Sequence, residues 1–148
     1  MRYRWSALTL VLALVLMPRV GRAQSQAAAP KTEVRQRQNY PNPFNPETWG
    51  TFSIDGAACG AGGGSHRVSV RIYNILMQVV AVPQLQGGSG GVAGGQPFEK
   101  ILLPCGQYTW YWNGFYGPTG KEAPSGVYIV LVDVDGRKSA PVKMTIKK

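Results

Sequence analysis

The eight-residue stretch from position 39 to position 46 constrains the fold of this chain more than any other part of its sequence. It consists of Asn39, Tyr40, Pro41, Asn42, Pro43, Phe44, Asn45 and Pro46. Proline lacks an N–H group and disfavours helical backbone in the residue before it, so this stretch does not form a helix. We expect an extended, stiff lead-in with Tyr40 and Phe44 as apolar anchors. The strand-like residues 48–54 that follow predict that it opens a β-domain.

The first 23 residues have the pattern of a secretory signal peptide. Arg2 and Arg4 form a basic start, residues 7–17 form an apolar run, and Gly21 and Ala23 supply the small residues for cleavage after Ala23. An uncleaved membrane anchor is the alternative, although the apolar run is short for a membrane span. No other stretch of the sequence is long and apolar enough, so we expect no membrane span after cleavage.

The segment that follows the signal peptide has a different composition from the rest. Residues 24–38 are mostly alanine, glutamine and arginine without apolar periodicity, which predicts a flexible leader. Residues 39–148 suffice for one domain. The leader is too short to fold alone, so we expect a single domain with no larger domain ahead of it.

Charge argues against a nucleic-acid partner. The 148-residue chain carries a net charge of +9, but four of its arginines lie in residues 1–23, so cleavage lowers the net charge to +5. The remaining basic residues are scattered rather than gathered in a patch of the kind that binds nucleic acid. An exported protein also rarely meets nucleic acid. Contact with an anionic polymer of the cell surface is a better alternative than nucleic acid, although the sequence supports it only weakly.

Two cysteines, Cys59 and Cys105, predict one disulfide, because an exported chain matures in an oxidising compartment. The chain-entropy model gives such a bond a stabilising effect of about 4 kcal/mol. Free thiols and intermolecular pairing are the alternatives. Neither cysteine has the spacing of a metal site, and the chain has one histidine, His66. We therefore expect no metal and no cofactor.

After residue 46, apolar and polar residues alternate with the period of two that is typical of β-strands. Phe52 and Ile54 are expected to point inward, and residues 67–74 and 79–82 are expected to form a hairpin. About seven strands separated by turns predict an all-β fold, a single Ig-like (fibronectin type III-like) antiparallel β-sandwich. The expected strands span residues 48–54, 67–74, 79–82, 98–103, 107–113, 125–132 and 138–147, with a hairpin turn at Asp135-Gly136.

One of these strands is rich in aromatic residues. Tyr108, Trp110 and Trp112 share one face of it. We assign that face to the core of the sandwich, because large aromatic side chains dominate protein cores. An aromatic platform for carbohydrate is the alternative, and Tyr111 and Tyr116 are the better candidates for exposure.

No motif in the sequence predicts catalysis. A nucleophilic triad needs a base, normally histidine, that a carboxylate orients. His66 adjoins a glycine-rich loop without a cysteine or serine pattern typical of a nucleophile, and the seven acidic residues show no pair suited to glycoside hydrolysis. A second glycine-rich loop, at 86–96, lacks the Gly-Lys-Ser/Thr needed to bind nucleotide phosphates. We therefore expect a protein that is not an enzyme.

The opening stretch, Asn-Tyr-Pro-Asn-Pro-Phe-Asn-Pro, resembles the first signature of the type A C-terminal sorting domain of type IX secretion, a family similar to the Ig-like domain of the flagellar hook-capping protein. Later motifs extend the resemblance over residues 39–148. The chain departs from it at Met77, where the family has glycine in a turn, and at Asn113, where it has aspartate. The turn after Asn113 also lacks the family's acidic residues, so no cation-binding role is carried over. The later matching residues are Ile72, Tyr73, Asn74, Trp112, Gly114, Gly126, Tyr128, Lys143 and Met144.

The resemblance implies an Ig-like β-sandwich in which Pro41, Pro43, Phe44, Trp112 and Tyr128 hold the fold rather than form a binding site. In that family the domain is the tail of a larger passenger. The secretion machinery recognises this tail domain, which is then removed or linked to the cell surface. We expect a secreted module with a structural or protein-binding role. The alternatives are a genuine sorting or anchoring substrate of type IX secretion and a carbohydrate-binding module.

The expected location follows from export. We expect the protein to be secreted, or to lie on the outer surface or in the periplasm of a Gram-negative-type bacterium. Its expected partner is a protein, or the secretion machinery, at the cell envelope. Self-assembly through strand edges is a further option.

Overall fold

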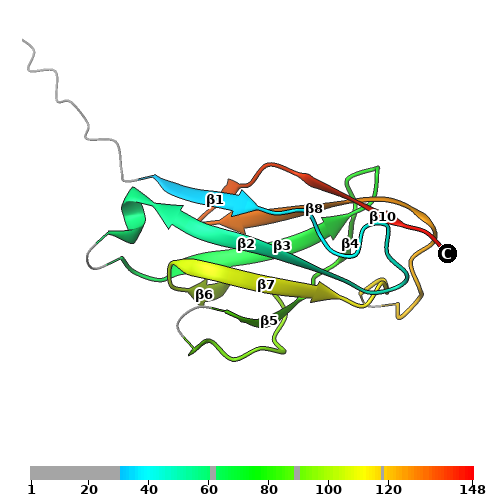
Figure 1. Cartoon of the computed structure of the whole chain (residues 1–148), viewed down its shortest axis with the longest axis horizontal. Helices are drawn as coiled ribbons and strands as arrows, with labels where there is room; N and C mark the ends of the chain where they lie inside the picture. Colours follow the sequence, from blue (N-terminus) through cyan, green and yellow to red (C-terminus); the bar gives the residue numbers. More distant parts are fainter. Residues whose placement is uncertain (1–30, 61–62, 89–90, 118) are drawn as a thin grey trace, which may run out of the picture.

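Two antiparallel β-sheets pack face to face in the computed structural model of this chain (Figure 1). The structure describes residues 31–148 except 61–62, 89–90 and 118, so the predicted signal peptide lies outside the described residues. The predicted all-β sandwich is confirmed. Its elements are β1 (Thr32–Gln36), β2 (Thr48–Gly56), the 3-10 turn η1 (Ala57–Cys59), β3 (His66–Tyr73), β4 (Val79–Ala81), β5 (Gln84–Gly88), β6 (Ile101–Leu103), β7 (Gly106–Trp112), β8 (Gly126–Val134), β9 (Arg137–Lys138) and β10 (Val142–Ile146).

The first sheet has the strand order β1-β2-β7-β5, and the second has the order β10-β8-β3-β4. Two short strands extend the second sheet, since β6 pairs with the start of β3 and β9 pairs with the end of β8. Between β4 and β7 the chain crosses from the second sheet to the first at β5, returns at β6, and crosses again at β7. Each crossing brings a loop to one end of the sandwich.

The core lies between the two sheets and follows from the alternation in the sequence. On the first sheet, Phe52 and Ile54 of β2 are buried, as predicted, and Tyr108, Trp110 and Trp112 of β7 are buried beside them. On the second sheet, alternate residues of β3 and β8 are buried against them; these are Val68, Val70, Ile72, Tyr128, Val130, Val132 and Val134. The aromatic strand therefore contributes to the core, as expected from its sequence.

The expected flexible leader is wrong over residues 32–36, which form strand β1. This strand pairs along its whole length with β2, and the side-chain amide of Gln36 bonds to Ser139 Oγ (2.5 Å) and to the carbonyl oxygen of Ala140 (3.1 Å). An edge strand is held by backbone hydrogen bonds on one side and needs little apolar periodicity, so its sequence resembles a leader. The domain begins before residue 39.

The opening stretch does not run extended. The backbone bends at residues 41–43 and at 45–46, and the peptide bonds before Pro41, Pro43 and Pro46 are cis. Tyr40 pairs with Trp49 through two backbone hydrogen bonds (2.8 and 3.0 Å), so the residues between them must form a loop. Only one of the two expected anchors is buried: Phe44 is 2% exposed, whereas Tyr40 is 81% exposed.

The two predicted hairpins are present, joining β3 to β4 and β8 to β9. The described part of the chain has ten strands rather than about seven. The excess arises because β1 and β5 lie in segments interpreted as leader and loop, and because the predicted final strand is divided into β9 and β10. Within the described residues, no helix has the length and apolar character that crossing a membrane requires.

Candidate functional site

The predicted disulfide joins Cys59 in η1 to Cys105, which lies between β6 and β7. The Cα atoms of the two cysteines are 5.8 Å apart, and 46 positions separate them in the sequence. The bond ties the crossing from β2 to β3 to the crossing from β6 to β7 at one end of the sandwich, which we call the disulfide end. Both cysteines are partly exposed.

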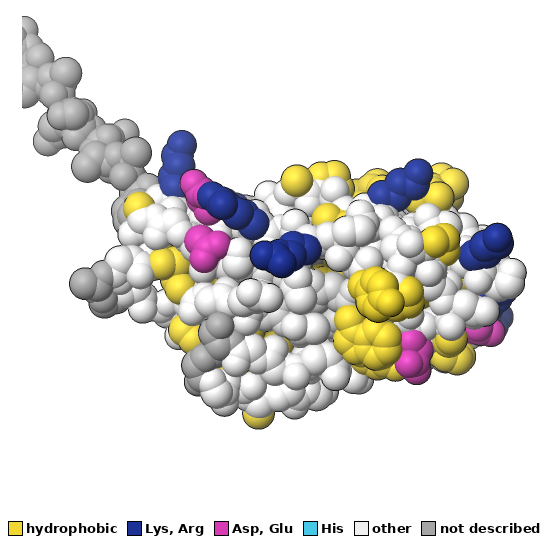
Figure 2. Space-filling view, in the orientation of Figure 1, with side chains coloured by type: hydrophobic (Ala, Val, Ile, Leu, Met, Phe, Trp, Pro, Cys, Tyr) yellow, Lys and Arg dark blue, Asp and Glu magenta, His cyan; other side chains and the backbone are white. Residues whose placement is uncertain are grey.

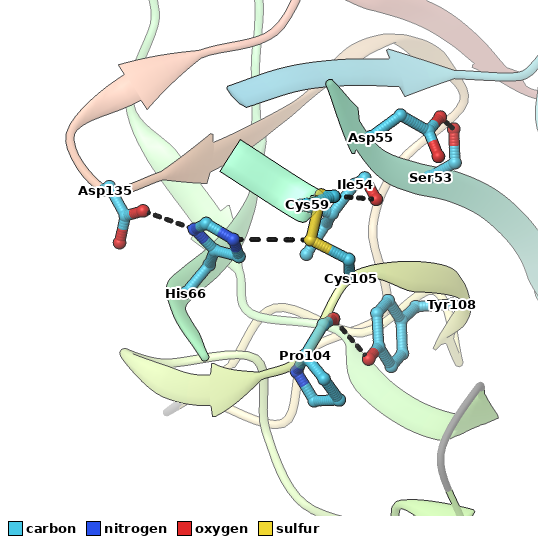
Figure 3. Close-up of a disulfide and its surroundings, with 9 residues drawn as sticks. All are labelled: Ser53, Ile54, Asp55, Cys59, His66, Pro104, Cys105, Tyr108 and Asp135. Carbon is cyan, nitrogen blue, oxygen red and sulfur yellow. Dashed lines mark hydrogen bonds and ion pairs between the residues drawn. A yellow bond between two sulfur atoms is a disulfide. The ribbon is translucent and has the colours of Figure 1, made fainter. Parts of the chain in front are cut away.

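His66 lies between this disulfide and a carboxylate (Figure 3). The residue is 7% exposed; Nε2 lies 3.4 Å from Cys105 Sγ, and Nδ1 lies 2.7 Å from Asp135 Oδ2. The other carboxylate oxygen of Asp135 accepts the backbone N–H of Arg67 (2.8 Å). Burial opposes ionisation of Asp135, but the hydrogen bonds from His66 and from the Arg67 amide outweigh it and lower the pKa of this carboxyl.

The carboxylate–imidazole–sulfur order is the arrangement that activates sulfur nucleophiles in enzymes. Neither partner of His66 is evident from the sequence, because Asp135 and Cys105 are 69 and 39 positions away. Pairing of Val68 with Val134, between β3 and β8, brings Asp135 close to His66. Pairing of His66 with Leu103, between β3 and β6, brings Cys105 close to His66. No local sequence motif predicts either contact.

His66 and the two cysteines could also be considered as metal ligands. Ligand atoms of Cys59, His66 and Cys105 all lie within 4.8 Å of one another. A thiolate rather than a disulfide sulfur is the form of cysteine that binds metal, and here the two sulfur atoms are bonded to each other. The arrangement present is therefore a disulfide with an adjacent histidine.

At the opposite end, the residues that carry the family resemblance meet in one apolar cluster. The ring of Phe44 contacts Trp112 edge-on, with centroids 5.7 Å apart, and Trp112 contacts Tyr128 in the same way at 5.4 Å. Met144 pairs with Tyr128 in the sheet and is fully buried. We call this group the motif cluster and this side of the sandwich the motif end.

Hydrogen bonds from the opening stretch fix this cluster to the last strand. The N–H of Phe44 donates to the carbonyl oxygen of Thr145 (2.9 Å), and the N–H of Lys147 donates to that of Phe44 (3.1 Å). Asn42 Oδ1 accepts the N–H of Thr145 (3.0 Å), and Asn39 Nδ2 donates within the stretch to the carbonyl oxygen of Pro41 (3.0 Å). The opening stretch thus clamps β10 to the body of the sandwich.

Two turns at the motif end depend on the residues that the resemblance singles out. Gly114 has a φ of 77°, and a Cβ there would overlap the carbonyl oxygen of Pro46. In the β3–β4 turn, Asn74 Oδ1 accepts the N–H groups of Leu76 and Gln78, both at 3.0 Å. The other motif residues are placed as follows: Ile72 and Tyr73 are buried at the end of β3, Gly126 begins β8, and Lys143 is exposed on β10.

Three aromatic side chains form a row on the outer face of the first sheet at the motif end. Tyr40 lies opposite Trp49, and Trp49 lies opposite Tyr111, with ring centroids of the second pair 5.2 Å apart. Residues directly opposite each other on antiparallel strands share a face. Trp49 is 40% exposed, and the hydroxyl of Tyr111 donates to Glu47 (2.9 Å). Figure 2 shows exposed hydrophobic side chains gathered over the ends of β2 and β7, with an acidic side chain beside them.

A groove of about 450 Å³ continues from this aromatic row. Tyr111 belongs to both, and Phe115 and Tyr116 line the groove opposite the β4–β5 crossing. Tyr111 and Tyr116, expected to be exposed, are each partly exposed. Burial, followed by a hydrogen bond and charge interaction with Tyr116, raises the pKa of Tyr128 in the motif cluster.

Comparisons with known proteins leave the family of this chain open. No protein-family profile and no curated protein matches it. A solved structure, Pseudomonas fluorescens alkylpurine DNA glycosylase AlkC bound to DNA containing an abasic site analog, resembles it with a TM-score of 0.45 and 14% sequence identity. The match covers 80% of this chain and 31% of that chain, so this chain spans about a third of the glycosylase.

One expectation is corrected by this comparison. From the sequence we expect a protein that is not an enzyme, whereas a solved structure that the chain resembles is an enzyme, so that expectation is withdrawn. A likeness at this TM-score and identity assigns no activity to the present chain. The expectations about family, partner and location stay predictions.

Proposed function

We propose that this chain is an exported β-sandwich module that binds a protein partner at the cell surface through the aromatic row of Tyr40, Trp49 and Tyr111. The observation that carries the proposal is the exposure of these rings on an otherwise well-packed sheet. Tyr40 is 81% and Trp49 is 40% exposed, although both side chains are large and apolar. Tryptophan and tyrosine dominate the residues on which protein partners anchor.

Further apolar side chains at the same end favour a protein over a carbohydrate. The β3–β4 turn exposes the aliphatic side chains of Ile75 (71%), Leu76 (73%) and Val79 (52%). Stacking on sugar rings uses aromatic faces and gives no reason for exposed aliphatic groups. Exposed apolar surface of this kind marks interaction sites in exported proteins as in others.

The test measures binding of the purified full chain to washed cells of the host. Trp49→Ala should weaken binding at least about tenfold, the effect of losing an interface anchor. Leu102→Ala is the matched control, because Leu102 is a 64% exposed apolar residue on the other sheet. Protease treatment of the cells should abolish binding if the partner is a protein, whereas enzymatic removal of surface glycans should not. Equal binding by the Trp49 variant and the wild type would refute the proposal.

A sorting or anchoring role in type IX secretion is the second candidate, and the motif cluster favours it. Phe44, Trp112, Tyr128 and Met144 come from four separate segments and meet in one place. These four residues all belong to the motifs that carry the resemblance. Because they form one contact network, they behave as a structural unit that includes the C-terminal strand.

This candidate is tested by a fusion. The signal peptide, a fluorescent passenger and residues 24–148 would be expressed in a bacterium that has a type IX system and in a mutant that lacks it. Delivery of the passenger to the surface only in the first strain supports a sorting role. Retention in the periplasm of both strains excludes it and leaves the binding proposal intact.

A further inference from the structure

The two sulfur atoms of the disulfide have different surroundings (Figure 3). Cys105 Sγ faces Nε2 of His66 at 3.4 Å, whereas Cys59 Sγ faces the carbonyl oxygen of Ile54 at 3.6 Å. A thiolate is stabilised beside an imidazolium and is disfavoured beside a carbonyl oxygen, which carries partial negative charge. If the bond opens, a thiolate is therefore more stable at Cys105 than at Cys59.

His66 is held in the orientation that such a role requires. An ionised carboxylate only accepts hydrogen bonds, so the Nδ1 of His66 carries the hydrogen that bonds to Asp135 Oδ2. Nε2, which faces Cys105 Sγ, then bears a proton only in the imidazolium form. The backbone N–H of Arg67 fixes the other oxygen of Asp135 (2.8 Å), so the carboxylate is held from two sides.

We propose that the Cys59–Cys105 disulfide is a thiol–disulfide exchange site. An external thiol attacks Cys59 Sγ, and His66 is the acid that protonates the leaving Cys105 Sγ. The incoming thiolate forms a new S–S bond to Cys59 Sγ as the bond between Cys59 and Cys105 breaks. The electron pair of the broken bond leaves on Cys105 Sγ, and the Nε2 proton of the imidazolium neutralises it. The product is a mixed disulfide on Cys59 and a thiol at Cys105.

A second external thiol completes the exchange. Its thiolate attacks the sulfur of the first thiol in the mixed disulfide, and Cys59 is released as a thiolate that takes a proton from water. Two external thiols are thereby oxidised to one disulfide, and the protein gains two electrons and two protons. Lower thiol pKa makes a better leaving group, so the contact with His66 accelerates the first step.

The result of exchange would be release of η1 from the strand crossing at Cys105. Within the described residues, η1 buries none of its three side chains, so the bond is its main tether to that crossing. Cys59 is also the position at which a thiol adduct would be carried. The site thus accepts thiols as a chemical class, whether from a small molecule or from another protein.

The experiment uses the purified, oxidised full chain and reduced glutathione as the probe. Samples are quenched in acid, free thiols are alkylated, and intact-mass and peptide analysis show which cysteine carries glutathione. In the wild type, glutathione is expected on Cys59, and the rate should rise in proportion to glutathione concentration. Adducts mainly on Cys105, or a rate that levels off at the rate of global unfolding, would overturn the proposal. This measurement needs no variant.

Substitutions then test the role of His66. His66→Gln should slow glutathione attack about a hundredfold, at the low end of the effect of a general acid, and should reduce the preference for Cys59. Arg67→Gln is the matched control, because this neighbouring side chain is exposed on the same strand and its amide contact to Asp135 is retained. Equal rates in the two variants would refute a role for the imidazole.

Asp135 is tested as a positioning residue. Asp135→Asn suits the turn, since the φ of residue 135 is 52° and asparagine tolerates this conformation well. We expect it to slow the reaction less than His66→Gln does and to lower the ratio of adducts on Cys59 to adducts on Cys105. A slower reaction with an unchanged ratio would show that Asp135 serves the fold alone and would overturn this part of the proposal.

Discussion

At the motif end of the sandwich, four separate segments meet through apolar side chains, whereas at the disulfide end two chain crossings are joined by a covalent bond. The motif cluster is closed by Phe44, Trp112 and Tyr128, all at most 3% exposed. At the disulfide end, η1 buries no side chain and sits in a glycine-rich segment. Where a loop lacks apolar side chains, packing cannot hold it, and a covalent link takes that role.

The difference extends to what each end can do. Contacts at the motif end are apolar and close-packed, so they change only when the fold changes. The disulfide end places a histidine and a carboxylate beside the bond that the proposed exchange would open. The motif cluster is therefore suited to holding the fold, and the disulfide end is suited to thiol chemistry.

Removing the anchor of the motif end should have the largest effect. Phe44→Ala deletes a ring that is 2% exposed and contacts Trp112. It should lower the free energy of unfolding by about 4 kcal/mol, as expected for a buried phenylalanine, measured by urea denaturation. Tyr40→Ala in the same stretch is the control and should cost less than about 0.5 kcal/mol, because Tyr40 is 81% exposed. Similar losses in both variants would show that the motif cluster does not anchor the opening stretch.

Removing the covalent link should cost somewhat less. Cys59→Ala combined with Cys105→Ala frees a loop of 46 positions, and native disulfides typically contribute about 2–4 kcal/mol. We expect about 3 kcal/mol, because the denatured chain keeps some residual structure that reduces the chain-entropy effect. Urea denaturation measures this loss, with the wild type under reducing conditions as the control. A loss below about 1 kcal/mol would mean that packing holds the disulfide end after all.

The ion pair at the disulfide end should give a smaller, pH-dependent effect. Asp135 has a lowered pKa in the folded protein, so its ionised form adds stability above its ordinary pKa of about 3.9. That contribution is lost as pH falls through the lowered value. Because the carboxylate is 45% exposed, Asp135→Asn should cost only about 1 kcal/mol at pH 7. Unfolding measured from pH 7 down to pH 2 should show the two proteins converging, and a constant gap would contradict the assignment.

The sequence predicts well the features that depend on neighbouring residues. Alternation in β2 places Phe52 and Ile54 inside, and the Asp135-Gly136 pair forms a hairpin turn with φ values of 52° and 81°. Two cysteines in a chain with a signal-like start were sufficient to predict the disulfide. Each of these follows from local geometry or from the chemistry of two side chains.

Features that depend on sheet pairing could not be predicted in the same way. The contact of His66 with Asp135 requires β3 to lie beside β8 in one particular register. Strand β1 is held by backbone pairing with β2 rather than by its own apolar pattern. Tyr40 is exposed because its backbone pairs with Trp49 in the orientation that turns both rings outward. The aromatic row and the histidine site both arise from register, which a single sequence does not specify.

The smallest expected effect sharpens the contrast between the two ends at their hairpin turns. Met77 has a φ of 58°, a conformation that is strained for methionine and favourable for glycine, the residue at this turn in the family that the chain resembles. Asp135 has a similar φ at the disulfide end, but its hydrogen bonds to His66 and Arg67 offset the backbone strain. Met77→Gly should therefore stabilise the fold slightly, by about 0.5 kcal/mol, since Met77 is 52% exposed and loses little packing.

Met77→Ala is the control and should give no gain, because alanine keeps the Cβ that makes this conformation strained. Thermal unfolding of the three proteins separates these outcomes, and a loss of stability in the glycine variant would show that the side chain of Met77 contributes packing that outweighs its backbone strain.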